Sequence, residues 1–251
     1  MRIAQHLSLA VLALTLSSLL SACATQTAEQ RARGQIFDPF EQTNRKIHNA
    51  NKAIDRAIFR PASNGYVTIF PPSVVTSFSH FSDYLSLPGD IVNALLQGDL
   101  KTAGNGTMRF LINTTVVGLA DPATDFEIPP VDTDFGETLF VWGFEEGAMV
   151  ELPLLGPSTT RDAIGVAVDF FTNPLSQASH PPVDNLGVYA EILERMGDRG
   201  NYSDTVDSIL YDSADSYAQA RIIYLQNRRF ELEGEASTTY LDPYDDPYAD
   251  F

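Results

Sequence analysis

DPFEQTNRKIHNANKAIDRAIFR, residues 38–60, is the strongest helix signal in the chain. It places Asp38 as a capping residue before Pro39 at the first helical position, with Glu41 at the third. The helix is expected to end near Arg60, because Pro61 disfavours the helical conformation of the residue before it. Four apolar residues share one face of this helix: Phe40, Ile47, Ile54 and Ile58.

Further helices are expected along most of the chain. Gly98 is placed to end one helix, Asp99 to cap the next, and Ser158 to cap a later one. Pro88 is expected to close or restart the helix in which it lies. Helical spacing indicates segments over residues 62–70, 74–98, 99–112, 158–171 and 202–230.

Residues 121–157 are rich in proline, glycine and aspartate. Short β-like runs are possible at 138–142 and 149–152, but no set of alternating strands emerges that could build a sheet. The sequence therefore predicts an all-α domain over residues 38–230.

The run FLINTTVVGLA, residues 110–120, carries no charge and has apolar residues on every face of a helix. A run of this length is too short to span a bilayer. Two interpretations remain open from the residues alone, a buried core helix and a segment that lies in a membrane without crossing it.

The first residues indicate an exported lipoprotein. A cationic start at Arg2 precedes the apolar stretch 7–20, and Leu-Ser-Ala-Cys at 20–23 resembles a bacterial lipobox. We expect residues 1–22 to be a signal peptide, Cys23 to carry the lipid, 23–37 to form a tether, and 231–251 to be an acidic disordered tail. The alternative is an ordinary secretory signal followed by an incidental cysteine. Ala24 in place of an aspartate favours the outer membrane.

Charge and motifs exclude several classes of function. The formal net charge is −17, and removal of Arg2 with the signal leaves −18, which argues against binding nucleic acid or adhering to an anionic bilayer by charge. The four histidines lie in no metal-binding pattern, and neither GxSxG nor a phosphate-binding loop occurs. No cofactor, metal site or catalytic residue is therefore predicted. Three carboxylate pairs are expected on the solvated surface: Asp83 with Asp90, Asp132 with Asp134, and Glu145 with Glu146.

An ordered set of short motifs resembles the MlaA (VacJ) lipoprotein family. The resemblance covers about residues 38–175 and, more loosely, the end of the last helix. The chain departs from the family at 116–120, which has one glycine where relatives often have several, and at Phe140, where many have glycine. The motifs are DPFE (38–41), NR (44–45), RP (60–61), NALLQG (93–98), RF (109–110), NTT (113–115), DFGETL (134–139), WG (142–143), LP (152–153), GPS (156–158) and RD (161–162).

The resemblance implies a helical ring in the inner leaflet of the outer membrane, facing the periplasm and associated with a trimeric porin. Such a protein takes phospholipid that has strayed into the outer leaflet and passes it to a periplasmic carrier, without any chemistry on the lipid. The resemblance also favours placing residues 110–120 in the membrane. Asn113, Thr114 and Thr115 would then offer polar groups along the lipid path beside Phe110 and Val116. An envelope lipid hydrolase and a structural, porin-associated lipoprotein are the alternatives.

Overall fold

The computed structural model describes residues 36–174 and 185–233. The expected signal peptide, the lipid attachment at Cys23, nearly all of the tether and the tail beyond residue 233 lie outside the described residues. The described chain is mostly helical. Its elements are α3 (Glu41–Ile54), the π-helix η1 (Asp55–Phe59), α4 (Arg60–Ile69), α5 (Pro72–Gln97), α6 (Leu100–Thr114), α7 (Pro122–Asp125), α8 (Phe135–Val141), β1 (Met149–Leu152), β2 (Gly156–Thr159), α9 (Thr160–Thr172), α11 (Leu186–Asn201), α12 (Ser203–Asp207), the π-helix η3 (Ser208–Asp212) and α13 (Ser216–Glu233).

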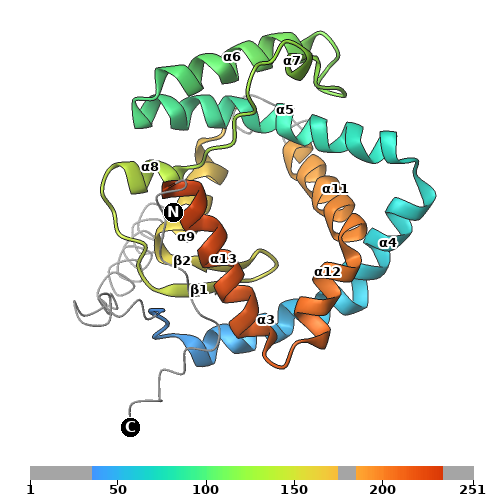
Figure 1. The fold of residues 1–251 in the computed structure, drawn as a ribbon, viewed down its shortest axis with the longest axis vertical. Coiled ribbons are helices and arrows are strands. Elements are labelled where there is room, and N and C mark those ends of the chain that lie inside the picture. The colour runs from blue at the N-terminus through green and yellow to red at the C-terminus, as the bar shows by residue number, and fades with distance from the viewer. Residues whose placement is uncertain (1–35, 175–184, 234–251) are drawn as a thin grey trace, which may run out of the picture.

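The helices form a ring (Figure 1). α3, α4 and α5 follow one another around its lower, right and upper sides, while α8, α9 and α13 form the left side. α11 packs against both α4 and α5, and α6 with α7 lies on the outer side of α5. In the described part of the chain, no helix is both long and apolar enough to cross a membrane.

The first helix differs from its prediction at both ends. Asp38 does not cap it; the helix begins at Glu41, and the Asp38 carboxylate accepts hydrogen bonds from Tyr217 (2.5 Å) and Arg221 (2.7 Å) of α13. Nor does Pro61 end it. The chain stays helical because η1 inserts one wide turn, in which the Arg60 N–H donates to the Asp55 carbonyl, and Pro61 then lies in the first turn of α4, where no N–H is needed.

Pro88 neither closes nor restarts a helix, since α5 runs through it without interruption. The ends predicted nearby are confirmed. Gly98 takes the left-handed conformation (φ 80°) that ends α5, and the Asp99 carboxylate accepts from the backbone N–H groups of Lys101 and Thr102, both at 3.0 Å.

Later predictions need more correction. Residues 138–142 belong mostly to α8, whereas 149–152 do form a strand, β1, which pairs with β2 as an antiparallel hairpin. Thr159, not Ser158, caps α9 by accepting from the N–H of Asp162. The segment 202–230 is not one helix but α12, η3 and α13, and α11 was not predicted.

The interior of the ring wall is more polar than apolar. Among the described residues, 12 hydrophobic residues and 17 polar or charged residues are buried. The buried hydrophobic cluster holds only Met149 and Leu225, with partly buried neighbours. Hydrophobic burial is the usual main source of stability, so this ring depends unusually strongly on its polar contacts.

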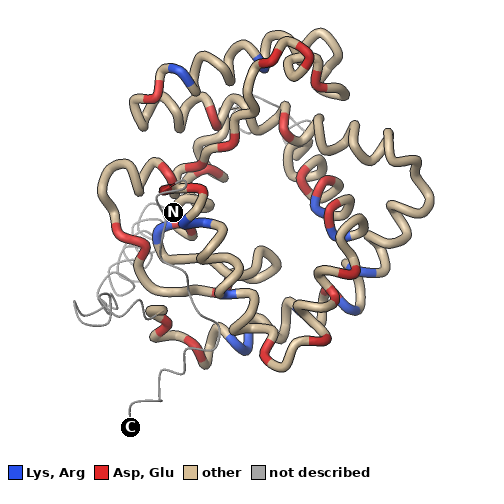
Figure 2. Tube along the Cα trace, viewed as in Figure 1, with Lys and Arg blue, Asp and Glu red and all other residues tan. Residues whose placement is uncertain are grey.

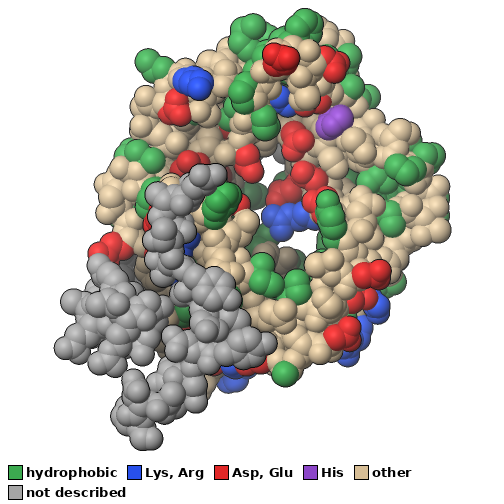
Figure 3. Space-filling model, in the orientation of Figure 1, with side chains coloured by type: hydrophobic (Ala, Val, Ile, Leu, Met, Phe, Trp, Pro, Cys, Tyr) green, Lys and Arg blue, Asp and Glu red, His purple; other side chains and the backbone are tan. Residues whose placement is uncertain are grey.

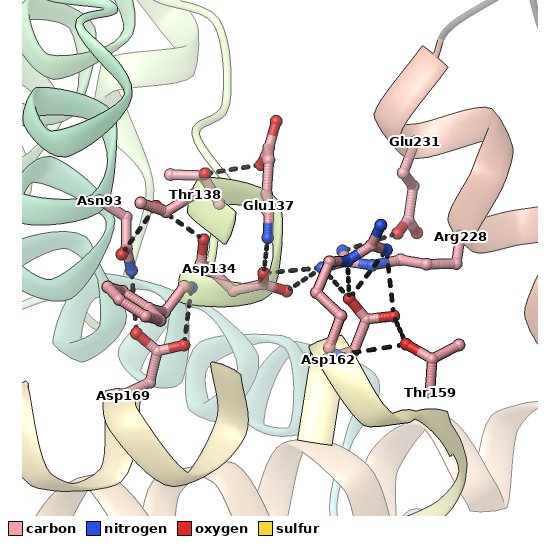
Figure 4. A network of polar contacts seen from close by, with 12 residues as sticks. Asn93, Asp134, Glu137, Thr138, Thr159, Asp162, Asp169, Arg228 and Glu231 are labelled. Carbon is pink, nitrogen blue, oxygen red and sulfur yellow. Dashed lines mark hydrogen bonds and ion pairs between the residues drawn. The ribbon is translucent and has the colours of Figure 1, made fainter. Parts of the chain in front are cut away.

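One polar network joins α13 to α8 and α9 (Figure 4). Arg228 of α13 donates to both oxygens of Asp134 at the start of α8 (2.7 and 2.8 Å) and lies 3.4 Å from Asp162 of α9. Asn93 of α5 donates to Asp169 of α9 at 2.9 Å and accepts from Thr138 of α8. These bonds fix four elements that are distant in sequence.

Candidate functional site

The ring is open at its centre. In the space-filling view, background is visible between the side chains at the middle of the molecule (Figure 3). α5 lies above this central opening and α11 to its right, and the turn of the β1–β2 hairpin reaches toward it from the left (Figure 1). An opening framed by elements from all parts of the chain is a natural place for a ligand.

One side of the central opening is acidic. Figure 3 shows acidic side chains gathered on the upper wall and beside α11, with a basic side chain next to them. Carboxylates from four segments act on one another electrostatically: Asp90 is within the fields of Asp83, Asp132 and Asp169, and Glu194 of α11 is within that of Asp83. Four of these five residues come from elements that surround the opening, α5, α9 and α11, and the fifth, Asp132, precedes α8; we call the five the acidic wall. In the described residues no group of His, Cys, Asp and Glu is placed to hold a metal ion.

Burial changes the charge of the acidic wall. Asp90 is only 7% exposed, and its carboxylate accepts one hydrogen bond from Ser86 at 2.9 Å. Burial, helped by the neighbouring carboxylates, raises the pKa of Asp90 to about 7. Burial also raises the pKa values of Asp169 and Glu194, which are only partly exposed. The wall is therefore polar, yet less charged at neutral pH than its composition indicates.

The β1–β2 turn contributes apolar side chains. Leu154 and Leu155 are 69% and 46% exposed. Asn51 of α3 holds the turn, since its Oδ1 accepts from the Leu154 N–H (2.8 Å) and its Nδ2 donates to the Leu152 carbonyl (2.9 Å). These bonds support a positive φ of 66° at Leu154, which is uncommon for a residue other than glycine. The opening thus combines a polar wall with an apolar projection, as an amphiphile requires.

The outside of the ring is apolar to an unusual degree. In the described ranges 31 large hydrophobic side chains are exposed, Leu154 and Leu155 of the opening among them, and Figure 3 shows hydrophobic groups at many points around the periphery. α6 and α7 alone expose Leu100, Met108, Leu111 and, just beyond α7, Phe126, which is 69% exposed. Such a surface is typical of contact with lipid or with another protein.

The predicted lipid-path residues lie on this outer side. α5 separates the end of α6 from the central opening in Figure 1. Phe110 stacks on Tyr84 of α5 with ring centroids 5.1 Å apart, and Thr114 and Thr115 are exposed with their hydroxyls bonded to helix carbonyls. Val116 is 37% exposed.

Asn113 differs from the other four lipid-path residues because it is buried. Its amide donates to Asp121 (2.8 Å) and its carbonyl oxygen accepts from the Ala123 N–H (3.1 Å), so the side chain fixes the turn that follows α6. The core-helix interpretation of residues 110–120 is wrong, since seven of these eleven residues are exposed.

The acidic wall was not predicted. Asp83, Asp132 and Glu145 are exposed, as expected of surface carboxylates, but Asp90 is buried, and the prediction for it is wrong. The second members of the other two predicted pairs bind arginines: Asp134 binds Arg228, and Glu146 binds Arg229 at 2.9 Å. The position of Asp90 directly after Pro88-Gly89, inside an apolar helix face, is the sequence signal that could have indicated its burial.

A second cluster has the connectivity of a serine hydrolase triad. His48 Nδ1 lies 3.1 Å from a Glu151 carboxylate oxygen, and its Nε2 lies 3.1 Å from Ser216 Oγ. All three side chains are buried, however, and Lys52 also donates to Ser216 Oγ at 3.3 Å. The arrangement joins α3, β1 and α13 and presents no exposed nucleophile.

Comparisons with known proteins agree with one another. The family model of the MlaA lipoprotein matches residues 36–231. The intermembrane phospholipid transport system lipoprotein MlaA of Escherichia coli is 32% identical over 93% of this chain and 90% of its own length. An uncharacterised protein of Rickettsia felis is 31% identical over 85% of this chain and 82% of its own.

The fold comparison leads to the same family. A solved structure from work on the structural basis for maintenance of bacterial outer membrane lipid asymmetry superimposes with a TM-score of 0.65 at 29% identity. The match covers 77% of this chain and 98% of the chain in the solved structure. With the family model spanning the whole described ring, this chain belongs to the MlaA lipoprotein family.

Proposed function

We propose that this lipoprotein removes phospholipid that has strayed into the outer leaflet of the outer membrane and passes it through the central opening to a periplasmic carrier. The observation that carries the proposal is the pairing of the acidic wall with the β1–β2 turn, which reaches toward that opening and exposes Leu154 and Leu155. A head group crossing a leaflet needs polar contacts, while its acyl chains need apolar ones.

The surroundings of the ring support the same function. The exposed hydrophobic side chains on the outside of the ring suit a body embedded in one leaflet, with lipid on Cys23 as the anchor. A trimeric porin would cover part of this surface, and the periplasmic face would meet the carrier. The protein acts without covalent chemistry, lowering the barrier to head-group transit.

Blocking the opening tests the proposal. Cys23 is the only cysteine, and lipidation would consume its thiol, so Leu154→Cys would supply the single reactive thiol. Cells carrying this variant, labelled with a maleimide that bears a large aromatic group, should accumulate surface phospholipid and become sensitive to bile-type detergents, as a deletion strain would. Leu100→Cys, exposed on the outer side of the ring, is the matched control and should leave transport unchanged.

Mass spectrometry would establish that both variants are fully labelled. Normal surface phospholipid in fully labelled Leu154→Cys cells would contradict passage through the opening. Fatty acid release from phospholipid by purified protein would favour the hydrolase alternative. Protein extracted in mild detergent with no bound phospholipid would favour the structural one.

A further inference from the structure

Three cations surround one aromatic ring on the edge of the protein opposite α6. Lys52 of α3, Arg56 of η1 and Arg60 of α4 are four residues apart and share one helical face. Their charged groups lie 5.6, 4.5 and 5.5 Å from the centre of the Tyr211 ring of η3. Three cations about one ring are unusual in a chain with a net charge of −17.

Only part of this positive charge is neutralised locally. Arg60 forms an ion pair with Asp207, and Arg199 pairs with both Asp55 (2.9 Å) and Asp207 (2.7 Å). Lys52 and Arg56, by contrast, form no ion pair with any residue that the structure describes. Among these six groups, the cations of Lys52, Arg56, Arg60 and Arg199 outnumber the carboxylates of Asp55 and Asp207 by two.

Tyr211 is a fixed platform for these cations. Its hydroxyl donates to Asp55 Oδ2 at 2.6 Å. Burial and this carboxylate raise the pKa of Tyr211 to about 12, so the phenol stays neutral at physiological pH. The flat ring orients the guanidinium of Arg56 by a cation–π contact, and an oriented guanidinium is well suited to a phosphate.

Apolar side chains lie beside the cations. Ile54 and Ile58, on the same α3–η1 segment, are 41% and 64% exposed. Figure 2 shows both basic and acidic residues along the lower edge of the ring, where α3 and the start of α4 run. Cations next to exposed isoleucines match the boundary between phosphate groups and acyl chains in a leaflet.

We propose that Lys52 and Arg56, supported by Tyr211, bind the phosphate of an anionic phospholipid head group at this edge. The inference rests on the proposed membrane location and goes beyond it by naming the lipid. A phosphatidylglycerol head group places one net negative charge against the two uncompensated cations. A choline or ethanolamine head group would place its ammonium against them as well, which weakens the attraction.

The strongly acidic remainder of the chain sharpens this selection. An anionic leaflet repels a strongly acidic chain, so the Lys52–Arg56 edge, where cations are in local excess, approaches the head groups more favourably than the acidic parts of the surface. Binding therefore also orients the ring in the leaflet.

Competition between two lipids tests the proposal. Full-length lipidated protein in mild detergent would receive equal amounts of dioleoyl phosphatidylglycerol and dioleoyl phosphatidylcholine, and native mass spectrometry would give the ratio of the two bound. The wild type should favour phosphatidylglycerol. Lys52→Gln and Arg56→Gln should each lower the ratio about fivefold, whereas Lys101→Gln, which removes an exposed cation on α6, should not change it.

Each remaining outcome decides the matter. Equal binding of the two lipids by the wild type, or an equal loss with Lys101→Gln, would overturn the proposal. A lipid preference that is lost in inorganic phosphate but kept in chloride of the same ionic strength would also overturn the proposal, since this would identify a site for free phosphate. Lys52→Gln and Arg56→Gln cells that still clear surface phospholipid would leave the transport function standing, so failure here is distinct from failure there.

Discussion

At the scale of single residues, the buried carboxylate of Asp90 governs how the ring responds to pH. Ser86 supplies one hydrogen bond, but three other carboxylates face the group. Ionising Asp90 inside the folded ring therefore costs free energy, which its pKa of about 7 reflects. The folded ring therefore favours the protonated form of Asp90 up to about pH 7.

This shift predicts a stabilising substitution. Below about pH 4, Asp90 is protonated in both the folded and the unfolded chain, so it contributes nothing to pH dependence. Between its ordinary pKa of 3.8 and about 7, the unfolded chain releases the proton while the folded chain keeps it, and stability falls as pH rises. Asp90→Asn should raise the free energy of unfolding by about 2 to 4 kcal/mol at pH 8 and barely at pH 4.

Denaturant unfolding at both pH values would measure the effect. Asp125→Asn, an exposed carboxylate on α7, is the matched control, and it should behave alike at the two pH values. A variant less stable than wild type at pH 8 would show that the Asp90 charge supports the fold after all.

At the scale of elements, the sequence predicted helices well where the signal was local. Gly98 and Asp99 act within one turn of the chain, and both were placed correctly. Pro61 and Pro88 were misjudged because their effect depends on neighbours: a π-helical turn precedes Pro61, and α5 is held on both sides by α6 and α11. The burial of Asp90 had a signal in the sequence, but its electrostatic neighbours did not, because Asp132 and Asp169 approach it only when the ring closes.

The turn after α6 distinguishes embedding in lipid from simple exposure. Val117 is 65% exposed with a positive φ of 56°, a conformation that Asp and Asn accept more readily than valine. Val117→Asp should therefore leave folding intact. If the turn lies in lipid, the charge costs a few kcal/mol at mid-depth and the protein should no longer clear surface phospholipid.

Val117→Asn keeps the same backbone preference without the charge, so it separates the charge from the geometry. We expect it to retain most of the activity. Circular dichroism and protein level would show that both variants fold. Full activity of Val117→Asp would place this turn in water.

At the scale of the whole molecule, the described chain exposes more large apolar side chains than it buries, which is the reverse of the usual arrangement in a water-soluble protein. The described residues bury 12 hydrophobic residues and expose 31 large ones. A water-soluble monomer rarely exposes so much apolar surface. Polar networks such as Arg228 with Asp134 and Asp162 hold the wall together instead, which leaves the apolar residues free to face outward.

This distribution predicts that the ring binds membranes without its acyl chains. A mature chain with Cys23→Ser, exported behind an ordinary secretory signal, should still partition into detergent micelles or bilayers. Its net charge cannot account for such binding, because a net charge near −18 repels an anionic surface, and the two cations at the Lys52–Arg56 edge add only a local attraction. Apolar contact must then supply the affinity, at about 25 cal/mol for each Å² removed from water.

Vesicle flotation at low and high salt would measure this partition and identify its source. Apolar binding should persist at high salt, which screens charges but does not weaken hydrophobic contact. A monodisperse, detergent-free monomer that does not float with vesicles would mean that the exposed side chains meet protein instead of lipid. The porin would then be the partner that covers them, and the lipid on Cys23 would be the only attachment to the membrane.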